Sequence, residues 1–129
     1  MPNKTKTTTK QRNKVKKEKS TIVGLTEKIT IKGPGGSKRL VARIDTGATM
    51  SSIDNKLASE LKLGPVIRTK LVKSAHGNTV RPVMMASLKL AGRDLKSKFT
   101  IADRTHMKYR VLIGQNILKK NFLVDCSKK

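Results

Sequence analysis

The chain has 129 residues, the length of one domain with a modest core. With two Phe, one Tyr and no Trp the core must be aliphatic, and no run approaches the ~20 apolar residues that span a bilayer. Thirty Lys and Arg against eight Asp and Glu give a net charge of +22, so we expect a polyanionic partner rather than scattered solvated charge.

The N-terminal segment, residues 1–20, is basic and polar. Val15 is its only aliphatic residue after Met1, so the segment cannot bury enough surface to offset the entropy of ordering. We expect a disordered arm whose cations bind nucleic acid, namely Lys4, Lys6, Lys10, Arg12, Lys14, Lys16, Lys17 and Lys19. Residues 21–129 keep 22 cations against seven acids, so the folded domain expected there is basic too.

Two apolar runs separated by glycines predict a hairpin at the start of this domain. Ile29 and Ile31 alternate with polar residues, residues 33–36 are Gly-Pro-Gly-Gly, and residues 40–44 are mainly apolar. A phosphate-binding loop is the alternative for the glycines, but no Gly-Lys-Ser/Thr follows them.

The rest of the chain predicts more strands than helix. A helix is expected over residues 55–63, because Leu57 and Leu61 share a face, Asp54 can cap the first turn and Gly64-Pro65 ends it. Strands are expected at 66–73, 79–90, 96–102, 111–113 and 122–124, with a hairpin tip at 74–78 and a short helix at 115–120.

Asp45-Thr46-Gly47, directly after the hairpin, is the candidate for chemistry. The end of an apolar strand partly desolvates a carboxyl group, and Gly47 lets the backbone approach it closely while Thr46 can hydrogen-bond locally. An ordinary Asp turn is the alternative, because a three-residue match is common by chance.

The wider pattern resembles that of retropepsin-like aspartic peptidases. These have Asp-Thr-Gly-Ala, two variable residues and Ser, here residues 45–51, and later two aliphatic residues, Gly, a polar residue and Asn, here residues 112–116. The chain is also similar to the RimK-associated prokaryotic subfamily labelled "ATP-dependent zinc protease", often found near ligases that add glutamates to proteins. Its motifs match Ile44 to Ala48, Arg81 to Val83, Arg104, Met107, Leu112 to Gly114 and Phe122 to Asp125.

This resemblance covers about residues 24–127 and has three departures. Thr49 and Gln115 stand where the subfamily usually has Arg, and Cys126 stands where it usually has Pro. Arginines at those two positions would orient an acidic substrate or hold the fold.

The resemblance implies an all-β fold, a small closed retropepsin-like barrel with one or two short helices. It implies two aspartates that share a proton, one activating water and the other donating to the scissile carbonyl. Because the chain has one Asp-Thr-Gly, the enzyme would be a C2 homodimer with Asp45, Thr46 and Gly47 from each subunit. The substrate-binding residues would be Ala48, Ile113, Gly114 and, at the tip of a closing flap, His76 and Gly77.

No metal and no cofactor are expected. His76, His106 and Cys126 are isolated and lack the paired spacing of zinc ligands, and no phosphate-binding loop for ATP is present. The single Cys and the absence of a secretory signal favour a cytoplasmic protein.

Two functions remain open at this stage. The first is an aspartic peptidase, a homodimer acting on peptides, with acidic or glutamate-rich chains favoured by the basic surface. The second is a basic, ribosome-associated protein that binds rRNA phosphates through arm and core, using the fold as a scaffold without catalysis. The intact Asp45-Thr46-Gly47 favours the peptidase, while the lack of large apolar anchors disfavours a membrane partner.

Overall fold

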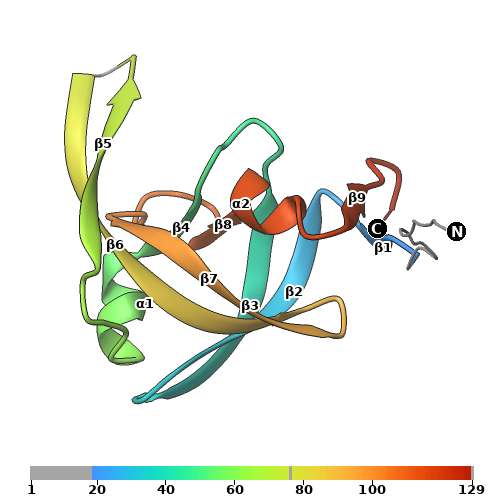
Figure 1. The fold of residues 1–129 in the computed structure, drawn as a ribbon, viewed down its shortest axis with the longest axis horizontal. Coiled ribbons are helices and arrows are strands. Elements are labelled where there is room, and N and C mark those ends of the chain that lie inside the picture. Colours follow the sequence, from blue (N-terminus) through green and yellow to red (C-terminus); the bar gives the residue numbers. More distant parts are fainter. Residues whose placement is uncertain (1–18, 76, 129) are drawn as a thin grey trace, which may run out of the picture.

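Alternating apolar and polar residues build the first hairpin of the protein (Figure 1). The computed structural model describes residues 19–75 and 77–128. In β2 (Thr26–Gly33), Ile29 and Ile31 are buried while Lys28 and Lys32 are exposed, as the period of a strand requires. β2 pairs antiparallel with β3 (Gly36–Ile44), so the predicted hairpin is confirmed.

Nine strands and two helices make up the described part of the chain. Besides β2 and β3, the elements are β1 (Thr21–Val23), β4 (Ser51–Asp54), α1 (Asn55–Glu60), β5 (Arg68–Ser74), β6 (Gly77–Leu90), β7 (Arg93–Ala102), β8 (Val111–Ile113), α2 (Gln115–Leu118) and β9 (Phe122–Val124).

Six of the strands close into a barrel. Their order is β2-β3-β8-β4-β7-β6, and β6 returns to pair with β2. The β3–β8 and β4–β7 pairs are parallel, whereas the other barrel pairs are antiparallel. β5 pairs only with β6, and this β5–β6 hairpin extends beyond the barrel in Figure 1. The closed all-β barrel with two short helices confirms the predicted fold class.

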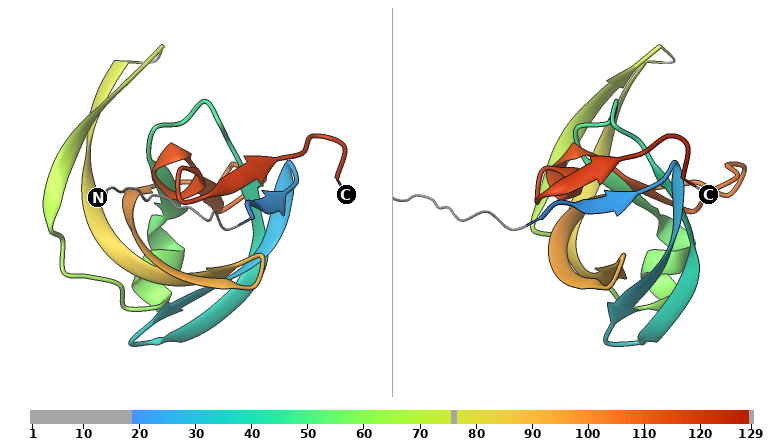
Figure 2. Two further views of the ribbon diagram at one scale, coloured as in Figure 1. Left: turned by 45° about the vertical axis from the view of Figure 1, so that its right-hand side comes forward. Right: turned by 90° about the vertical axis from the view of Figure 1, so that its right-hand side faces the viewer.

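The two ends of the described chain meet in a separate small sheet. β1 and β9 pair in parallel, with Thr21 opposite Phe122 and Val23 opposite Val124. Figure 2 shows them side by side, with α2 close to β9. The core beneath is almost wholly aliphatic, as the composition predicts, and Phe99 and Phe122 are its only buried aromatic side chains among the described residues.

The differences from the predicted elements have local causes. The helix predicted over residues 55–63 ends at Glu60, with Leu61 as its C-cap, although Asp54 caps its start as expected. β4 was not predicted, because Ser51 and Ser52 look like loop residues although both are buried. β1 was missed because its three residues pair with a strand about a hundred residues away.

The predicted arm, residues 1–20, lies outside the described residues except for Lys19 and Ser20. Its disorder and its role in binding nucleic acid therefore stay predictions. No helix in the described ranges is long and apolar enough to cross a membrane.

Candidate active site

Asp45 lies just beyond the end of β3, where the chain leaves the barrel. Its backbone N–H donates to the carbonyl of Ile113 (2.9 Å), and its Oδ1 accepts from the backbone N–H of Gly47 (2.9 Å). The residue is half-buried, and its Oδ2 accepts no hydrogen bond from any described residue. One carboxylate oxygen is thus fixed by the backbone while the other is free to act on a reacting group.

The loop that carries Asp45 is fastened to the start of α2. The N–H of Gln115 donates to the carbonyl of Ala48 (2.8 Å), and the Gln115 side-chain amide donates to the carbonyl of Thr46 (2.8 Å). Gly114 packs so closely that a Cβ there would lie 2.7 Å from the carbonyl oxygen of Met50. Any side chain at Gly114 would therefore push the loop away, which explains the glycine.

A buried clamp of Ser51 and Asn116 holds the far end of the same loop. The N–H and the hydroxyl of Ser51 both donate to Oδ1 of Asn116 (2.8 Å each), and Ser51 Oγ accepts from the N–H of Gly114 (2.9 Å). The Asn116 amide donates in turn to Ser97 Oγ and the Lys98 carbonyl. The Ser and Asn of the two sequence motifs are therefore structural partners that set the position of Asp45.

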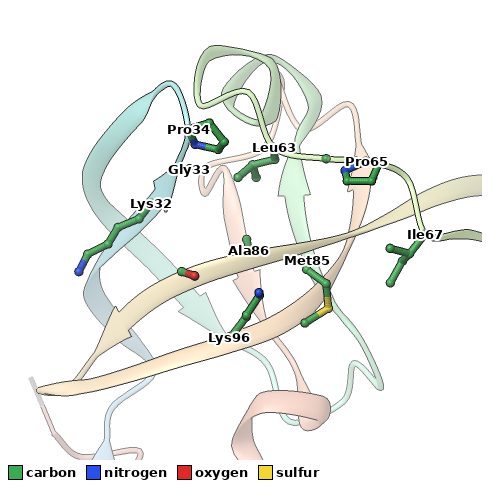
Figure 3. Close-up of a pocket in the computed structure, with 11 residues that line it drawn as sticks. Lys32, Gly33, Pro34, Leu63, Pro65, Ile67, Met85, Ala86 and Lys96 are labelled. Carbon is green, nitrogen blue, oxygen red and sulfur yellow. The ribbon is translucent and has the colours of Figure 1, made fainter.

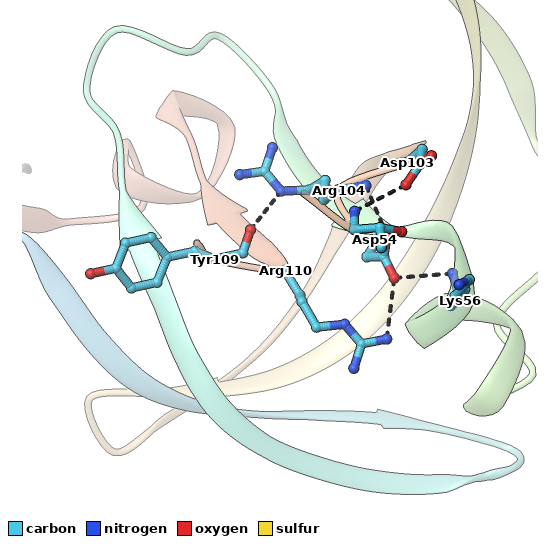
Figure 4. Close-up of polar contacts among 7 residues, drawn as sticks. Asp54, Lys56, Asp103, Arg104, Tyr109 and Arg110 are labelled. Atoms are coloured by element: carbon cyan, nitrogen blue, oxygen red, sulfur yellow. Dashed lines mark hydrogen bonds and ion pairs between the residues drawn. The ribbon is translucent and has the colours of Figure 1, made fainter. Parts of the chain in front are cut away.

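Below this loop, Asp54 joins three segments of the chain (Figure 4). Its Oδ1 accepts from the backbone N–H of Arg104 (2.8 Å), and its Oδ2 accepts from Nη2 of Arg110 (3.1 Å) and the N–H of Lys56 (3.2 Å). Burial acts to raise the pKa of Asp54, but the bonds from Arg104 and Arg110 outweigh it and hold this pKa below its ordinary value. Asp54 is thus a buried, ionised anchor for the segment that carries Arg104.

Arg104 brings positive charge close to Asp45. Its Nε donates to the Tyr109 carbonyl (2.9 Å), and the residue is only 9% exposed. Burial first, and the neighbouring Arg81 second, lower the pKa of Arg104, while Asp54 and Asp45 act to raise it. The guanidinium of Arg104 therefore interacts electrostatically with both Arg81 and the candidate catalytic carboxylate.

A pocket of about 450 Å³ lies between the Asp45 loop and the β5–β6 hairpin. Its lining includes four cations, Lys70, Lys73, Arg81 and Arg104, with Leu71, Val72 and Leu112 as apolar walls. Ser52 also lines it, and its hydroxyl is the one buried side-chain polar atom of the described residues that has no hydrogen-bond partner. Such a group needs a water or a ligand atom to supply the missing bond.

Of the eight residues predicted for catalysis and substrate binding, four lie on one loop and two lie beneath it. Asp45, Thr46, Gly47 and Ala48 form the loop; Gly47 and Ala48 line the pocket, whereas Asp45 and Thr46 are not among its lining residues. Ile113 and Gly114 are buried beneath that loop, so their assigned contact with substrate stays a prediction. Gly77 begins β6 at the hairpin tip, and His76 lies outside the described residues.

Ser52, Arg81 and Arg104 were not predicted as site residues. Both arginines belong to the motifs that the sequence shares with the bacterial subfamily, and that signal could have placed them at the site. No such signal marks Ser52. Within the described residues no group of three or more His, Cys, Asp or Glu could hold a metal ion.

Comparison with known families gives one match. The model of a family described as RimB-like, "Retropepsin-like aspartic endopeptidase RimB", matches residues 54–129. No curated protein sequence matches the chain significantly.

Solved structures share the fold at low sequence identity. A protein of unknown function from Legionella pneumophila is 19% identical with a TM-score of 0.57, covering 84% of this chain and 94% of its own. The EIAV protease, solved with the inhibitor HBY-793, is 22% identical with a TM-score of 0.59, covering 83% and 92%. The simian foamy virus (mac) protease is 21% identical with a TM-score of 0.52, covering 73% and 91%.

Proposed function

Because the chain belongs to the RimB-like family of retropepsin-like aspartic endopeptidases, we propose that it hydrolyses peptide bonds. Asp45 precedes the matched residues 54–129, and we assign it as the catalytic carboxylate from its geometry. The observation that carries this proposal is the geometry of Asp45, which has one oxygen held by Gly47 and lies on the loop whose Gly47 and Ala48 line the cationic pocket. The Ser51–Asn116 clamp supports it, because a group that transfers protons must be fixed in place.

The chemistry needs a second carboxylate at the same site. One Asp takes a proton from water, which attacks the carbonyl carbon, while the other gives its proton to the carbonyl oxygen. In the described chain no acid lines the pocket beside the Asp45 loop, and Asp54 is buried under three hydrogen bonds. We therefore assign the second carboxylate to Asp45 of a second copy in a C2 homodimer.

Exposed apolar side chains on and beside the β1–β9 sheet support this assembly. Ile22 and Leu123 on the β1–β9 sheet are 43% and 56% exposed, and Leu25 is 49% exposed. The carbonyl of Leu25 accepts from the N–H of Ile44, the residue before Asp45, so this surface adjoins the catalytic loop. Burying it against a second copy would remove apolar area from water and place two Asp45 loops near one axis.

Sedimentation of the purified protein is expected to give twice the 14.2 kDa chain mass. Leu25→Asp with Leu123→Asp places charge on this surface and should yield monomers without peptidase activity, because each monomer has half a site. Val66→Asp, at an exposed apolar residue outside the β1–β9 sheet, serves as the control and should leave the dimer intact. A monomeric wild type that still cleaves peptide would contradict the two-carboxylate mechanism.

The pocket beside Asp45 supports an acidic substrate. Four cations line it without an acid among its lining residues, and Ser52 adds an unpaired hydroxyl. A substrate carboxylate can accept from guanidinium and hydroxyl together, and hydrogen bonds to charged groups are the stronger ones. We infer that peptides with Glu or Asp beside the scissile bond are preferred.

Arg81→Gln tests this preference, because Arg81 is only half-buried and its guanidinium hydrogen-bonds to no other described residue, so the substitution should leave the fold intact. We expect kcat/KM for a Glu-containing peptide to fall about 10- to 100-fold, and for the matching Gln-containing peptide to change little. Arg68→Gln, on the exposed edge of β5 outside the pocket, should affect neither peptide. Equal losses on both peptides would contradict a role in charge selection.

A further inference from the structure

The outer face of the barrel opposite its core carries a second concentration of positive charge. Outward-facing residues of β2, β3, β6 and β7 include six cations, here named the outer basic face: Lys28, Lys32, Arg39, Lys89, Lys96 and Lys98. Asp94 is the one acid among the outward-facing residues of these four strands in the described chain, and its contact with Lys32 is long, at 3.8 Å. None of the six lines the pocket beside Asp45.

Strand register, rather than chance, gathers these cations. Thr30 lies opposite Arg39 on one side and Lys89 on the other, so two cations flank one hydroxyl. In the next row, Ser87 lies between Lys32 and Lys96 in the same way. Residues directly opposite one another are about 5 Å apart, so the charges form a grid roughly 10 Å across each row with hydroxyl donors between them.

Two hollows lie along this face. The first, of about 540 Å³, has Lys32, Lys96 and Ser87 at one side and mainly apolar residues at the other, among them Leu63, Pro65 and Met85 (Figure 3). The second hollow, of about 410 Å³, is lined by Lys28, Thr30, Arg39 and Lys89 together with one acid, Glu27. Three cations outnumber this acid, so an anionic group can lie between the ammonium and guanidinium groups of the second hollow.

The two-dimensional spread of the cations favours a nucleic acid over an acidic polypeptide. An extended acidic peptide puts carboxylates on one side only at every second residue, in a single line. A nucleic-acid duplex offers two lines of closely spaced phosphates, which a grid four strands wide can contact together. The face has no aromatic residue for base stacking, so recognition would be of phosphates and shape, as for duplex RNA.

We propose that the outer basic face binds the phosphate backbone of structured RNA, independently of the peptidase site and of the N-terminal arm. Because the two sites share no residue, RNA can be held on the barrel wall while the Asp45 pocket stays open to a peptide. RNA binding by this face would hold the protein on structured RNA whether or not its Asp45 site cleaves peptides.

The test uses the full chain and a short fluorescent RNA duplex, followed by anisotropy at several KCl concentrations between about 50 and 200 mM. The face variant is Arg39→Gln, Lys89→Gln and Lys96→Gln. The control variant, Lys56→Gln, Lys108→Gln and Lys119→Gln, removes the same charge from exposed residues of other segments. Each variant's melting curve is compared with that of the wild type, so that unfolding is recognised.

The face variant is expected to bind RNA about tenfold more weakly or worse. The slope of its log binding constant against log KCl concentration should be shallower by about 2–3. The control variant should change the affinity and this slope much less. Equal losses in the two variants would mean that total charge alone drives binding, and an unchanged face variant would assign binding to the arm. If poly-glutamate displaces RNA from the wild type and the control but not from the face variant, the face would be assigned to acidic polypeptides. Each of these three results overturns the proposal, whereas an inactive peptidase site would leave it untouched.

Discussion

Asp45→Asn is expected to abolish peptide cleavage, lowering kcat/KM by about 10³-fold. Asn has nearly the shape of Asp, and its side-chain oxygen can still accept from the N–H of Gly47, so the loop should keep its position. It cannot take a proton from water or share one with a symmetry mate, and the chemical step therefore loses its base. Cleavage of a Glu-containing peptide, followed by mass spectrometry, measures the effect.

Asp94→Asn is the matched control for this substitution. Its carboxylate is well exposed on β7 and has only a long contact with Lys32, so cleavage should continue at the wild-type rate. Near-normal activity in Asp45→Asn, with the same cleavage position, would refute Asp45 as the catalytic carboxylate. Melting curves of both variants should match the wild type, which separates a chemical loss from unfolding.

Among the aspartate substitutions considered, replacing Asp54 is expected to lower the free energy of unfolding the most. Asp54→Ala removes three hydrogen bonds and leaves the backbone N–H of Arg104 unpaired in a buried position, at a cost of about 3 kcal/mol or more. Asp54→Asn keeps an acceptor but loses the charge, and about 1–2 kcal/mol is expected. Urea denaturation measures both, and Asp94→Ala should stay within about 0.5 kcal/mol of the wild type.

The Asp54 effect should depend on pH in a defined direction. Because the pKa of Asp54 is lower in the folded protein than in the unfolded chain, its ionised form stabilises the fold above the unfolded value of about 4. That contribution is lost as the pH falls through the folded-state pKa. The stability difference between wild type and Asp54→Asn should therefore shrink below about pH 4, and a difference that grew there would contradict the assignment of an ionised Asp54.

Much of the fold follows from local pattern and motif. Alternating apolar residues and a glycine turn predict the β2–β3 hairpin, and alternation also predicts the long strands β6 and β7. A capping residue, Asp54, predicts the start of α1. Each of these signals acts over only a few residues. The barrel itself was expected from the family resemblance and not from these patterns. Pairings such as β3–β8 and β4–β7 are parallel and join distant segments, and local sequence does not encode them.

The candidate site likewise has a part that local sequence predicts and a part that only the folded chain shows. Asp45 and its loop could be predicted because Asp-Thr-Gly is a contiguous signal. Ser51 and Asn116 were seen as motif members, but their hydrogen bond across 65 residues appears only in the folded chain. Ser52 gives no signal at all, because an unpaired buried hydroxyl is a property of its surroundings and not of its residue type.

The pairing of β1 with β9 has a consequence for the life of the nascent chain. Phe122 is synthesised about a hundred residues after its partner Thr21, so this sheet forms only once both segments have left the ribosome. Pairing two segments about a hundred residues apart in the sequence also closes a long loop, which is slow and costs chain entropy. If the two subunits meet on this sheet, a newly made polypeptide cannot assemble its peptidase site until β9 has emerged and paired with β1, and activity then depends on cellular concentration.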